Sequence, residues 1–340
     1  MKKNIYFLLL LLLFSCGKEN PFPNKISDFN PELQVHLKKL ASKKELSSGD
    51  TIAKNYIKEK CSKEELLKLL KCENPLLRVI AYRAIVNRNE KDYFKILLGH
   101  LNDTTKVTWW YFEDAADSYK VSDLLIRKAV DNRKLTKTEK QILVDSVLLK
   151  HSYLESSYWM MTDIHSNEKY YSIIKQKSIV KTDRCGLQSR SCYALSKFKK
   201  KEDLEFLKSV FSKLESPCED WAFRAIEENP HKIYFPILEK YLKTIKKNKM
   251  EVDSEKIIYY CRAVAKYKSI ESLILLTEIL NKSNYIDDRY LSLNQQYVFK
   301  AIHKHKTPIY DDLYKKLKPQ MGEYVIKYID SIDYRDKKTW

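Results

Sequence analysis

Histidine is the side chain best suited to metal binding and to acid–base chemistry near neutral pH, and the chain contains seven. Only His303 and His305 lie close together, and residues two positions apart on a helix point about 200° from each other. Only a turn would let the two rings share a metal ion. The sequence also lacks His-Glu-x-x-His, Gly-x-Ser-x-Gly and Cys-x-x-Cys motifs, which mark common catalytic sites. We therefore predict no enzyme, no cofactor and no metal site.

A different chemistry is indicated at Cys16. Two cations, Lys2 and Lys3, precede an apolar run over residues 5–14 that is too short to span a membrane as a mature helix. The run ends in Leu13-Phe14-Ser15-Cys16, which resembles the lipobox of bacterial lipoproteins. The resemblance implies cleavage before Cys16, a diacylglyceryl thioether on its sulfur and acylation of its new amine. An ordinary secretory signal with a chance cysteine is the alternative.

The residues around Cys16 bear on where such an anchor would place the protein. Residues 1–15 are the predicted signal peptide. Gly17 follows the cysteine, with no Asp there, so the resemblance implies the outer membrane, either at its periplasmic face or at the cell surface. Residues 16–31 contain three prolines and few strongly apolar side chains. This composition predicts a flexible tether that reaches about 50 Å when extended.

The elements that must position any site are clearest between Asn74 and Asp103. Apolar residues with the spacing i, i+3, i+4, i+7, i+8 predict a helix with one buried face; they are Leu77, Ile80, Ala81, Ala84 and Ile85. A polar break separates them from a second stripe, formed by Phe94, Leu97, Leu98 and Leu101. Asn74 can cap the first helix, and Pro75 suits its first position. Such short helices need a partner face, so we predict an αα-hairpin.

Part of this pattern returns along the chain. An alanine flanked by similar residues marks five positions: Ala84, Ala194, Ala225, Ala263 and Ala301. The last four are 31, 38 and 38 residues apart. Ala115 and Ala116 fit a further copy, and residues 135–179 are predicted to hold a degenerate one. Two helices in every 30 to 40 residues or so predict an all-α fold, an α-solenoid of stacked hairpins.

The copy over residues 74–107 resembles a HEAT repeat. The residues that carry the resemblance are Pro75, Arg78, Ala81, Ala84, Asp103, Lys106 and Val107. It implies that acidic and basic residues between units link neighbouring repeats, within one array over residues 32–340. TPR repeats are disfavoured because their Trp-Leu-Gly-Tyr pattern is absent. An irregular all-α domain without a true array is the alternative.

Six cysteines remain after Cys16, and disulfides are permitted beyond the inner membrane. Cys185 and Cys192 are seven positions apart, about 10 Å on one helix, which is beyond disulfide reach. Cys185 and Cys218 lie near the starts of consecutive units and could meet. Cys261 lies on an apolar stripe, so we expect a buried free thiol there. The sequence leaves the full pairing open.

Cations concentrate near the ends of the first helices of the predicted hairpins. The net charge is +18, and +16 without Lys2 and Lys3. Equivalent turns stack along one edge of a solenoid, which predicts a basic ridge of Lys199, Lys200, Lys201, Lys232, Lys266, Lys268, Lys304 and Lys306. Such a ridge would attract polyanions. The favourable interaction of cations with helix C-termini explains the same pattern without a partner.

Trp109 and Trp110 form an unusual pair. On a helix, adjacent side chains diverge by about 100°, so both cannot face one core. An exposed Trp beside Glu113 and Asp114 would be a contact for a protein or a sugar. Packing in the core is the alternative.

These features favour a membrane-anchored, non-enzymatic repeat lipoprotein that acts as a protein-binding scaffold in the cell envelope. The alternative is a binder of anionic envelope polymers, either lipopolysaccharide or an acidic glycan. A hydrolase with an unrecognised site is a third interpretation. Nucleic acid is the usual partner of a basic protein, but an exported lipoprotein meets little of it, so no nucleic-acid partner is expected.

Overall fold

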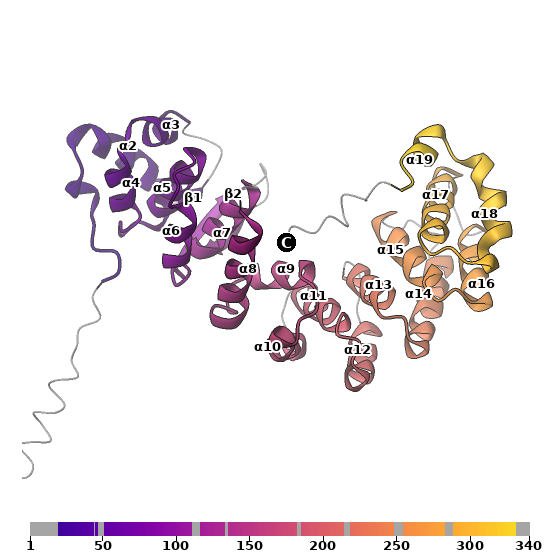
Figure 1. The fold of residues 1–340 in the computed structure, drawn as a ribbon. Helices are drawn as coiled ribbons and strands as arrows, with labels where there is room; N and C mark the ends of the chain where they lie inside the picture. Colours follow the sequence, from indigo (N-terminus) through magenta and orange to yellow (C-terminus); the bar gives the residue numbers. More distant parts are fainter. Residues whose placement is uncertain are drawn as a thin grey trace, which may run out of the picture. The chain divides into compact units, whose positions relative to one another are not determined.

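The computed structural model describes residues 20–43, 45–46, 51–110, 116–132, 135–181, 185–213, 218–247, 254–282 and 288–330. These residues are mostly helical, which confirms the predicted all-α class (Figure 1). The chain divides into two compact units, unit 1 (Met1–Lys140) and unit 2 (Gln141–Trp340). The division falls inside the region predicted as one array. Within the described residues, no helix is long and apolar enough to cross a membrane.

Unit 1 is organised around one buried helix, α5. Its elements are η1 (Ile26–Asp28), α2 (Pro31–Ala41), β1 (Glu45–Leu46), α3 (Thr51–Lys60), α4 (Lys63–Leu69), α5 (Pro75–Asn87), α6 (Tyr93–Gly99), β2 (Lys106–Trp110), β3 (Ala116–Lys120), α7 (Val121–Asp131) and α8 (Lys137–Asp145), which crosses into unit 2. The predicted hairpin is confirmed by α5 and α6. The Asn74 side chain caps α5 by accepting from the amides of Leu76 and Leu77 at 3.0 and 3.3 Å. Helices α2, α3, α4, α6 and α7 pack against α5, so both of its faces are covered.

A three-stranded sheet occupies the place where Ala115 and Ala116 were expected to begin another helical copy. β2 pairs with β3 in antiparallel register and with β1 in parallel register. The helical prediction for Ala116 is wrong, and Ala115 lies outside the described residues. β-Branched and aromatic residues at 107–110 favour a pleated strand over a helix. After the sheet, α7 packs against α5 and contains the buried Ala129.

The predicted tether is wrong for Phe22 to Asn30, because this segment packs against the rest of unit 1. Asn24 donates its amide to the Lys71 carbonyl at 3.1 Å and accepts from the Glu73 amide at 2.9 Å. The Phe22 ring lies 3.7 Å from the Arg78 guanidinium carbon. Composition predicted a coil, and these contacts join residues more than 40 positions apart. Residues 16–19 lie outside the described part.

Unit 2 contains two series of alternating helices. The first series, here called the A helices, is α9 (Ser156–Asp163), α11 (Cys185–Ser196), α13 (Glu219–Glu228), α15 (Ser254–Ala265) and α17 (Asp288–Lys304). The second, the B helices, is α10 (Glu168–Ile179), α12 (Leu204–Phe211), α14 (Phe235–Lys247), α16 (Ile270–Ile279) and α18 (Asp311–Leu317). The remaining elements are η2 (Ser146–Lys150), η3 (Lys201–Asp203), η4 (Lys232–Tyr234), η6 (Pro308–Tyr310), η7 (Lys318–Gln320) and α19 (Glu323–Lys327).

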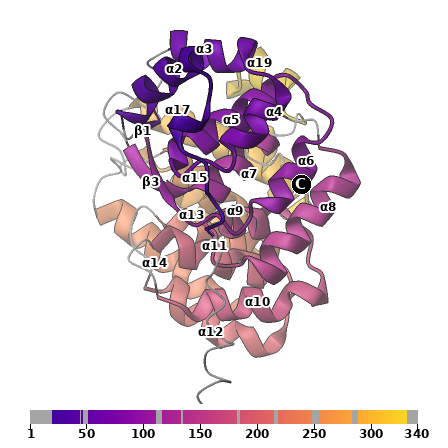
Figure 2. The same cartoon turned by 90° about the vertical axis from the view of Figure 1, so that its left-hand side faces the viewer.

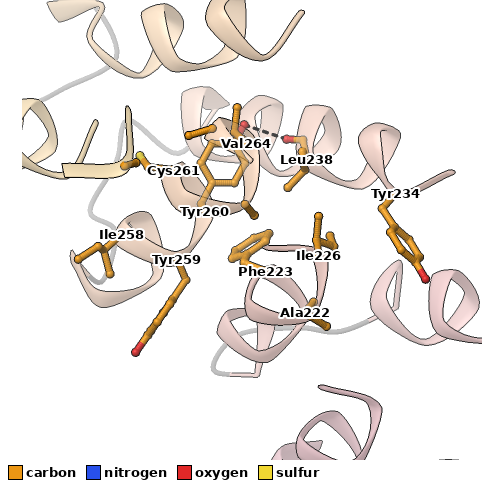
Figure 3. Close-up of a cluster of buried hydrophobic side chains, with 14 of the residues drawn as sticks. Ala222, Phe223, Ile226, Tyr234, Leu238, Ile258, Tyr259, Tyr260, Cys261 and Val264 are labelled. Atoms are coloured by element: carbon orange, nitrogen blue, oxygen red, sulfur yellow. Dashed lines mark hydrogen bonds between the residues drawn. The ribbon is translucent and has the colours of Figure 1, made fainter. Parts of the chain in front are cut away.

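Each A helix packs against the next one along the chain, and Figure 2 shows α11, α13 and α15 following one another. The region 135–179, where a degenerate copy was predicted, contains the helices α9 and α10. Between the A and B helices lies an apolar core (Figure 3). In it the Tyr260 hydroxyl donates to the Leu238 carbonyl at 3.1 Å, which joins α15 to α14.

The repeat alanines are buried as predicted. The exposed fractions of Ala84, Ala194, Ala225, Ala263 and Ala301 are 3%, 1%, 0%, 0% and 0%. A small side chain at this position lets neighbouring A helices approach closely.

The turn after the repeat alanine has a recurring backbone shape. The fifth residue after the alanine has a positive φ in three copies: Asn89 (59°), Lys199 (55°) and Lys268 (53°). This left-handed conformation ends a helix by turning the chain away from its axis. The same cap therefore occurs at the same offset from the alanine in both units.

Candidate functional site

Tyr259 and Tyr260 are neighbours in α15 that point in opposite directions (Figure 3). Tyr260 points toward α14, the B helix, and Tyr259 lies on the other side of α15. The side of the A helices on which Tyr259 lies is called the A face below. Here the polar residues and rings of α11, α13 and α15 meet.

The A face carries an arginine enclosed by three aromatic rings. The guanidinium carbon of Arg224 lies 4.3 Å from the ring centroid of Trp221, 5.0 Å from Tyr193 and 5.2 Å from Tyr259. The rings of Tyr193 and Trp221 are themselves in contact, with centroids 5.6 Å apart. Tyr193 and Tyr259 are buried, whereas Trp221 and Arg224 are half-buried. The ring faces carry partial negative charge and hold the cation in place.

A second arginine, Arg190 of α11, approaches the same Trp221 ring, with its guanidinium carbon 5.2 Å from the centroid. Its Nε atom is buried and has no hydrogen-bond partner. Burial lowers the pKa of Arg190, and Arg224 lowers it further, while Asp220 acts in the opposite direction. The pKa of Asp220 is itself raised, chiefly by burial, although Arg224 and Arg190 oppose the shift.

Next to this cluster, a buried carboxylate joins three A helices. One oxygen of Glu227 accepts from Arg262 Nε at 2.9 Å, and the other from His305 Nε2 and Lys304 Nζ, each at 3.0 Å. Burial alone would raise the pKa of Glu227, but these three partners reverse the effect and hold it far below its usual range. Burial lowers the pKa of His305, against the opposing effect of Glu227. The site is therefore a structural ion network, with its acceptors occupied.

Some lysines of the predicted ridge are paired with acidic residues. Lys200 pairs with Glu168 at 3.0 Å and lies 3.5 Å from the Tyr171 ring centroid, and Lys304 pairs with Glu227. Acidic residues of neighbouring elements therefore neutralise these two lysines. Lys266 is half-buried. Five are exposed and form no ion pair with any described residue: Lys199, Lys201, Lys232, Lys268 and Lys306.

Trp109 and Trp110 lie on β2, not on a helix, and strand geometry sends adjacent side chains to opposite faces. Trp110 donates its Nε1–H to the Glu45 carboxylate at 2.6 Å. The Trp109 ring lies 4.9 Å from the guanidinium carbon of Arg127 and 5.5 Å from that of Arg83. Both rings are half-buried and are used within unit 1. Glu113 and Asp114 lie outside the described residues.

The cysteines of the described part are mostly buried thiols: Cys61, Cys72, Cys192 and Cys261. Burial raises their pKa, that of Cys192 to about 12, which makes them unreactive. The thiol predicted for Cys261 is confirmed. Cys218 is disulfide-bonded. Cys16 and the side chain of Cys185 lie outside the described part.

The two close histidines have separate partners. His303 Nε2 lies 2.7 Å from an Asp330 oxygen and its Nδ1 3.1 Å from the Tyr314 hydroxyl, whereas His305 contacts Glu227. Among the described residues no group of His, Cys, Asp and Glu is placed to hold a metal ion. A pocket of about 50 Å³ beside Phe211, Phe223 and Ile237 is far smaller than usual ligand sites.

No protein-family model, curated protein or solved structure matches the chain. The sequence predictions missed the cluster of Arg190, Tyr193, Trp221, Arg224 and Tyr259. A signal was present, because Tyr193 and Arg224 directly precede repeat alanines. Such residues share a face once the helices are aligned by those alanines.

Proposed function

We propose that the chain is a HEAT-like α-solenoid lipoprotein that acts as a non-enzymatic, protein-binding scaffold in the cell envelope. The solenoid interpretation is supported by the serial packing of the A helices, the buried repeat alanines and the recurring turn. Arg78 and Asp103, which the family resemblance singled out, form a buried ion pair between elements, as expected for residues that link repeats.

The observation that carries the binding proposal is the cluster on the A face. Trp, Tyr and Arg are the residues that dominate binding energy at protein interfaces. Trp221 and Arg224 are half-buried, so they are accessible but already held in position by Tyr193 and Tyr259. A partner would therefore lose little side-chain entropy in binding them.

The envelope location rests on the lipobox resemblance and on Cys218. A disulfide persists in an oxidising compartment such as the periplasm or the cell surface. If lipid is attached at Cys16, the six residues from there to Phe22 reach about 20 Å at most. Unit 1 would then be held close to the outer membrane. Labelling with a fatty-acid analogue should mark the wild-type protein and not Cys16→Ser; equal labelling of both would contradict the anchor.

The scaffold proposal is tested by photo-crosslinking in whole cells. A photoreactive amino acid replaces Trp221 on the A face, or Ile270 in B helix α16 as the control, where 67% of the residue is exposed. We expect a discrete protein adduct from position 221 and none from position 270. Adducts at neither position, or the same adduct at both, would contradict binding through the A face.

Binding of an anionic polymer is the alternative, and a specific observation supports it. Two of the five exposed ridge lysines, Lys199 and Lys268, occupy left-handed positions where glycine is preferred. A lysine in this conformation makes the folded protein less stable than a glycine would, yet a positive charge is present at both positions. Lipopolysaccharide binding that weakens steeply with salt, and is lost when the five exposed lysines are replaced by glutamine, would favour this function. If neither salt nor the glutamine replacements weaken binding, the lysine ridge is not the binding site.

A further inference from the structure

Arg190 and Arg224 are two cations that share one aromatic ring and form no ion pair with any described residue. Their guanidinium carbons lie 5.2 and 4.3 Å from the Trp221 centroid. The two charges are therefore separated by less than about 10 Å, the Debye length at moderate salt. Neither side chain makes a hydrogen bond or an ion pair with any residue that the structure describes. Their guanidinium groups instead contact aromatic rings.

This arrangement differs from that of two other buried arginines of the described part. Arg78 and Arg262 are paired with Asp103 and Glu227. Arg190 and Arg224 are half-buried and repel each other, and Asp220 interacts electrostatically with both without forming an ion pair. Two partly desolvated guanidinium groups without an acceptor would gain from an anion that reaches both.

We propose that Arg190 and Arg224 bind carboxylate groups of an acidic segment in the partner protein. This inference rests on the proposed scaffold function and names the chemistry of the partner. A guanidinium presents its donors as a planar fork, which matches a carboxylate bidentately. The rings of Tyr193, Trp221 and Tyr259 fix the fork of Arg224. The half-buried Trp221 ring also offers apolar surface to the side chains that lie between the acidic residues of such a segment.

The charges around Glu227 and His305 also bear on the kind of ligand that could approach. Lys266 at the end of α15 is half-buried and forms no ion pair with a described residue. Glu227, the most buried carboxylate of this region, is already neutralised by three partners. An acidic segment would meet the guanidinium groups on the A face, where Asp220, Asp163 and Glu155 also act electrostatically on Arg190.

The test uses the full chain and two fluorescent peptides, hexaglutamate and hexaglutamine. Fluorescence anisotropy is measured at about 0.15 M salt. We expect hexaglutamate to bind and hexaglutamine not to bind. Arg190→Lys and Arg224→Lys keep the charge but lose the fork, and each should weaken binding about tenfold. The matched control, Lys199→Gln with Lys201→Gln, removes two exposed charges from the same unit and should change affinity less than about twofold.

Three outcomes would overturn the proposal: equal binding of both peptides, unchanged affinity of the arginine-to-lysine variants, or a larger loss in the lysine control. Circular dichroism checks that each variant is folded. The crosslinking experiment keeps this result separate from the scaffold function. An adduct at position 221 that persists in Arg190→Lys and Arg224→Lys would leave the scaffold standing and exclude the carboxylate site.

Discussion

Arg78 and Asp103 form a buried, two-pronged ion pair across 25 residues of sequence. Arg78 Nε and Nη2 donate to the two oxygens of Asp103 at 2.7 and 3.0 Å. The exposed fractions of Arg78 and Asp103 are 1% and 3%. Arg78 Nη1 also donates to the carbonyls of Cys72 and Glu73 at 2.7 and 3.0 Å. The Asp103 carbonyl accepts from the Ser122 hydroxyl at 2.9 Å at the start of α7. The pair thus ties α5 to the chain that enters the following elements.

We predict that Asp103→Asn destabilises unit 1 by about 3–5 kcal/mol, because it leaves the buried guanidinium without a counter-charge. Urea unfolding followed by circular dichroism measures the loss. Arg78→Met with Asp103→Leu removes both charges together and should recover most of the stability. A double variant as unstable as Asp103→Asn would mean that the hydrogen bonds to the backbone, and not the charge pair, matter most.

Local periodicity was enough to predict α5, α6 and the buried face that carries Ala84. The same reasoning failed at Ala116. The prediction relied on the spacing of one alanine and gave too little weight to the β-forming residues before it. It also failed at Phe22, because a Pro-rich composition says nothing about a distant partner such as Arg78. Pairing of Arg190 with Trp221 depends on how two A helices are aligned, so no single stretch of sequence contains it.

Ala225 tests the close approach of the A helices. We predict that Ala225→Leu costs about 1–3 kcal/mol, because the side chain is fully buried and the added atoms overpack the core. Glu205→Leu is the control, since its side chain is 80% exposed in α12 and leucine favours a helix. Urea unfolding of both variants gives the comparison. A loss below about 0.5 kcal/mol at position 225 would show that the helices do not rely on a small residue there.

The left-handed lysines offer a way to remove charge without loss of stability. Lys199→Gly and Lys268→Gly should each stabilise the protein by about 0.5–1 kcal/mol, because glycine adopts the positive φ without a steric cost. Lys201 begins η3 with ordinary backbone geometry, so Lys201→Gly should be neutral or destabilising. Thermal melting of the three variants decides. If Lys199→Gly and Lys268→Gly melt below the wild type, the lysine side chains themselves stabilise the turns.

Thiol counting tests the disulfide. Denatured wild-type protein without reductant should show four free thiols, those of Cys61, Cys72, Cys192 and Cys261, when Cys16 is lipidated. We predict that Cys185 is the partner of Cys218, because a Cβ on the adjacent Gly186 would lie 4.0 Å from the Cys218 sulfur. Cys218→Ser should then expose one more thiol, and Cys185→Ser with Cys218→Ser should return the count to the wild-type value. A count that stays raised in the double variant would assign a different partner.

The network around Glu227 predicts that unit 2 loses stability in acid in two stages. The pKa of His305 is lowered by burial, so the unfolded chain takes up a proton near pH 6.5 before the folded one does. Stability contributed by neutral His305 is present above about pH 6.5 and declines as the pH falls below it. The pKa of Glu227 is held below its usual range, chiefly by His305, Arg262 and Lys304 against the effect of burial. Its contribution is therefore lost only below about pH 4.5.

The experiment compares urea-unfolding midpoints of the wild type and His305→Gln between about pH 7.5 and pH 4. Glutamine keeps an N–H that can donate to Glu227 but does not titrate, so the variant should show a smaller decline between about pH 6.5 and pH 5 and the same decline below it. His151→Gln is measured alongside, because burial also lowers the pKa of His151, and its share of the decline has to be separated from that of His305. If His305→Gln follows the wild-type profile over the whole range, His305 does not sense pH and the acid sensitivity arises elsewhere in the unit.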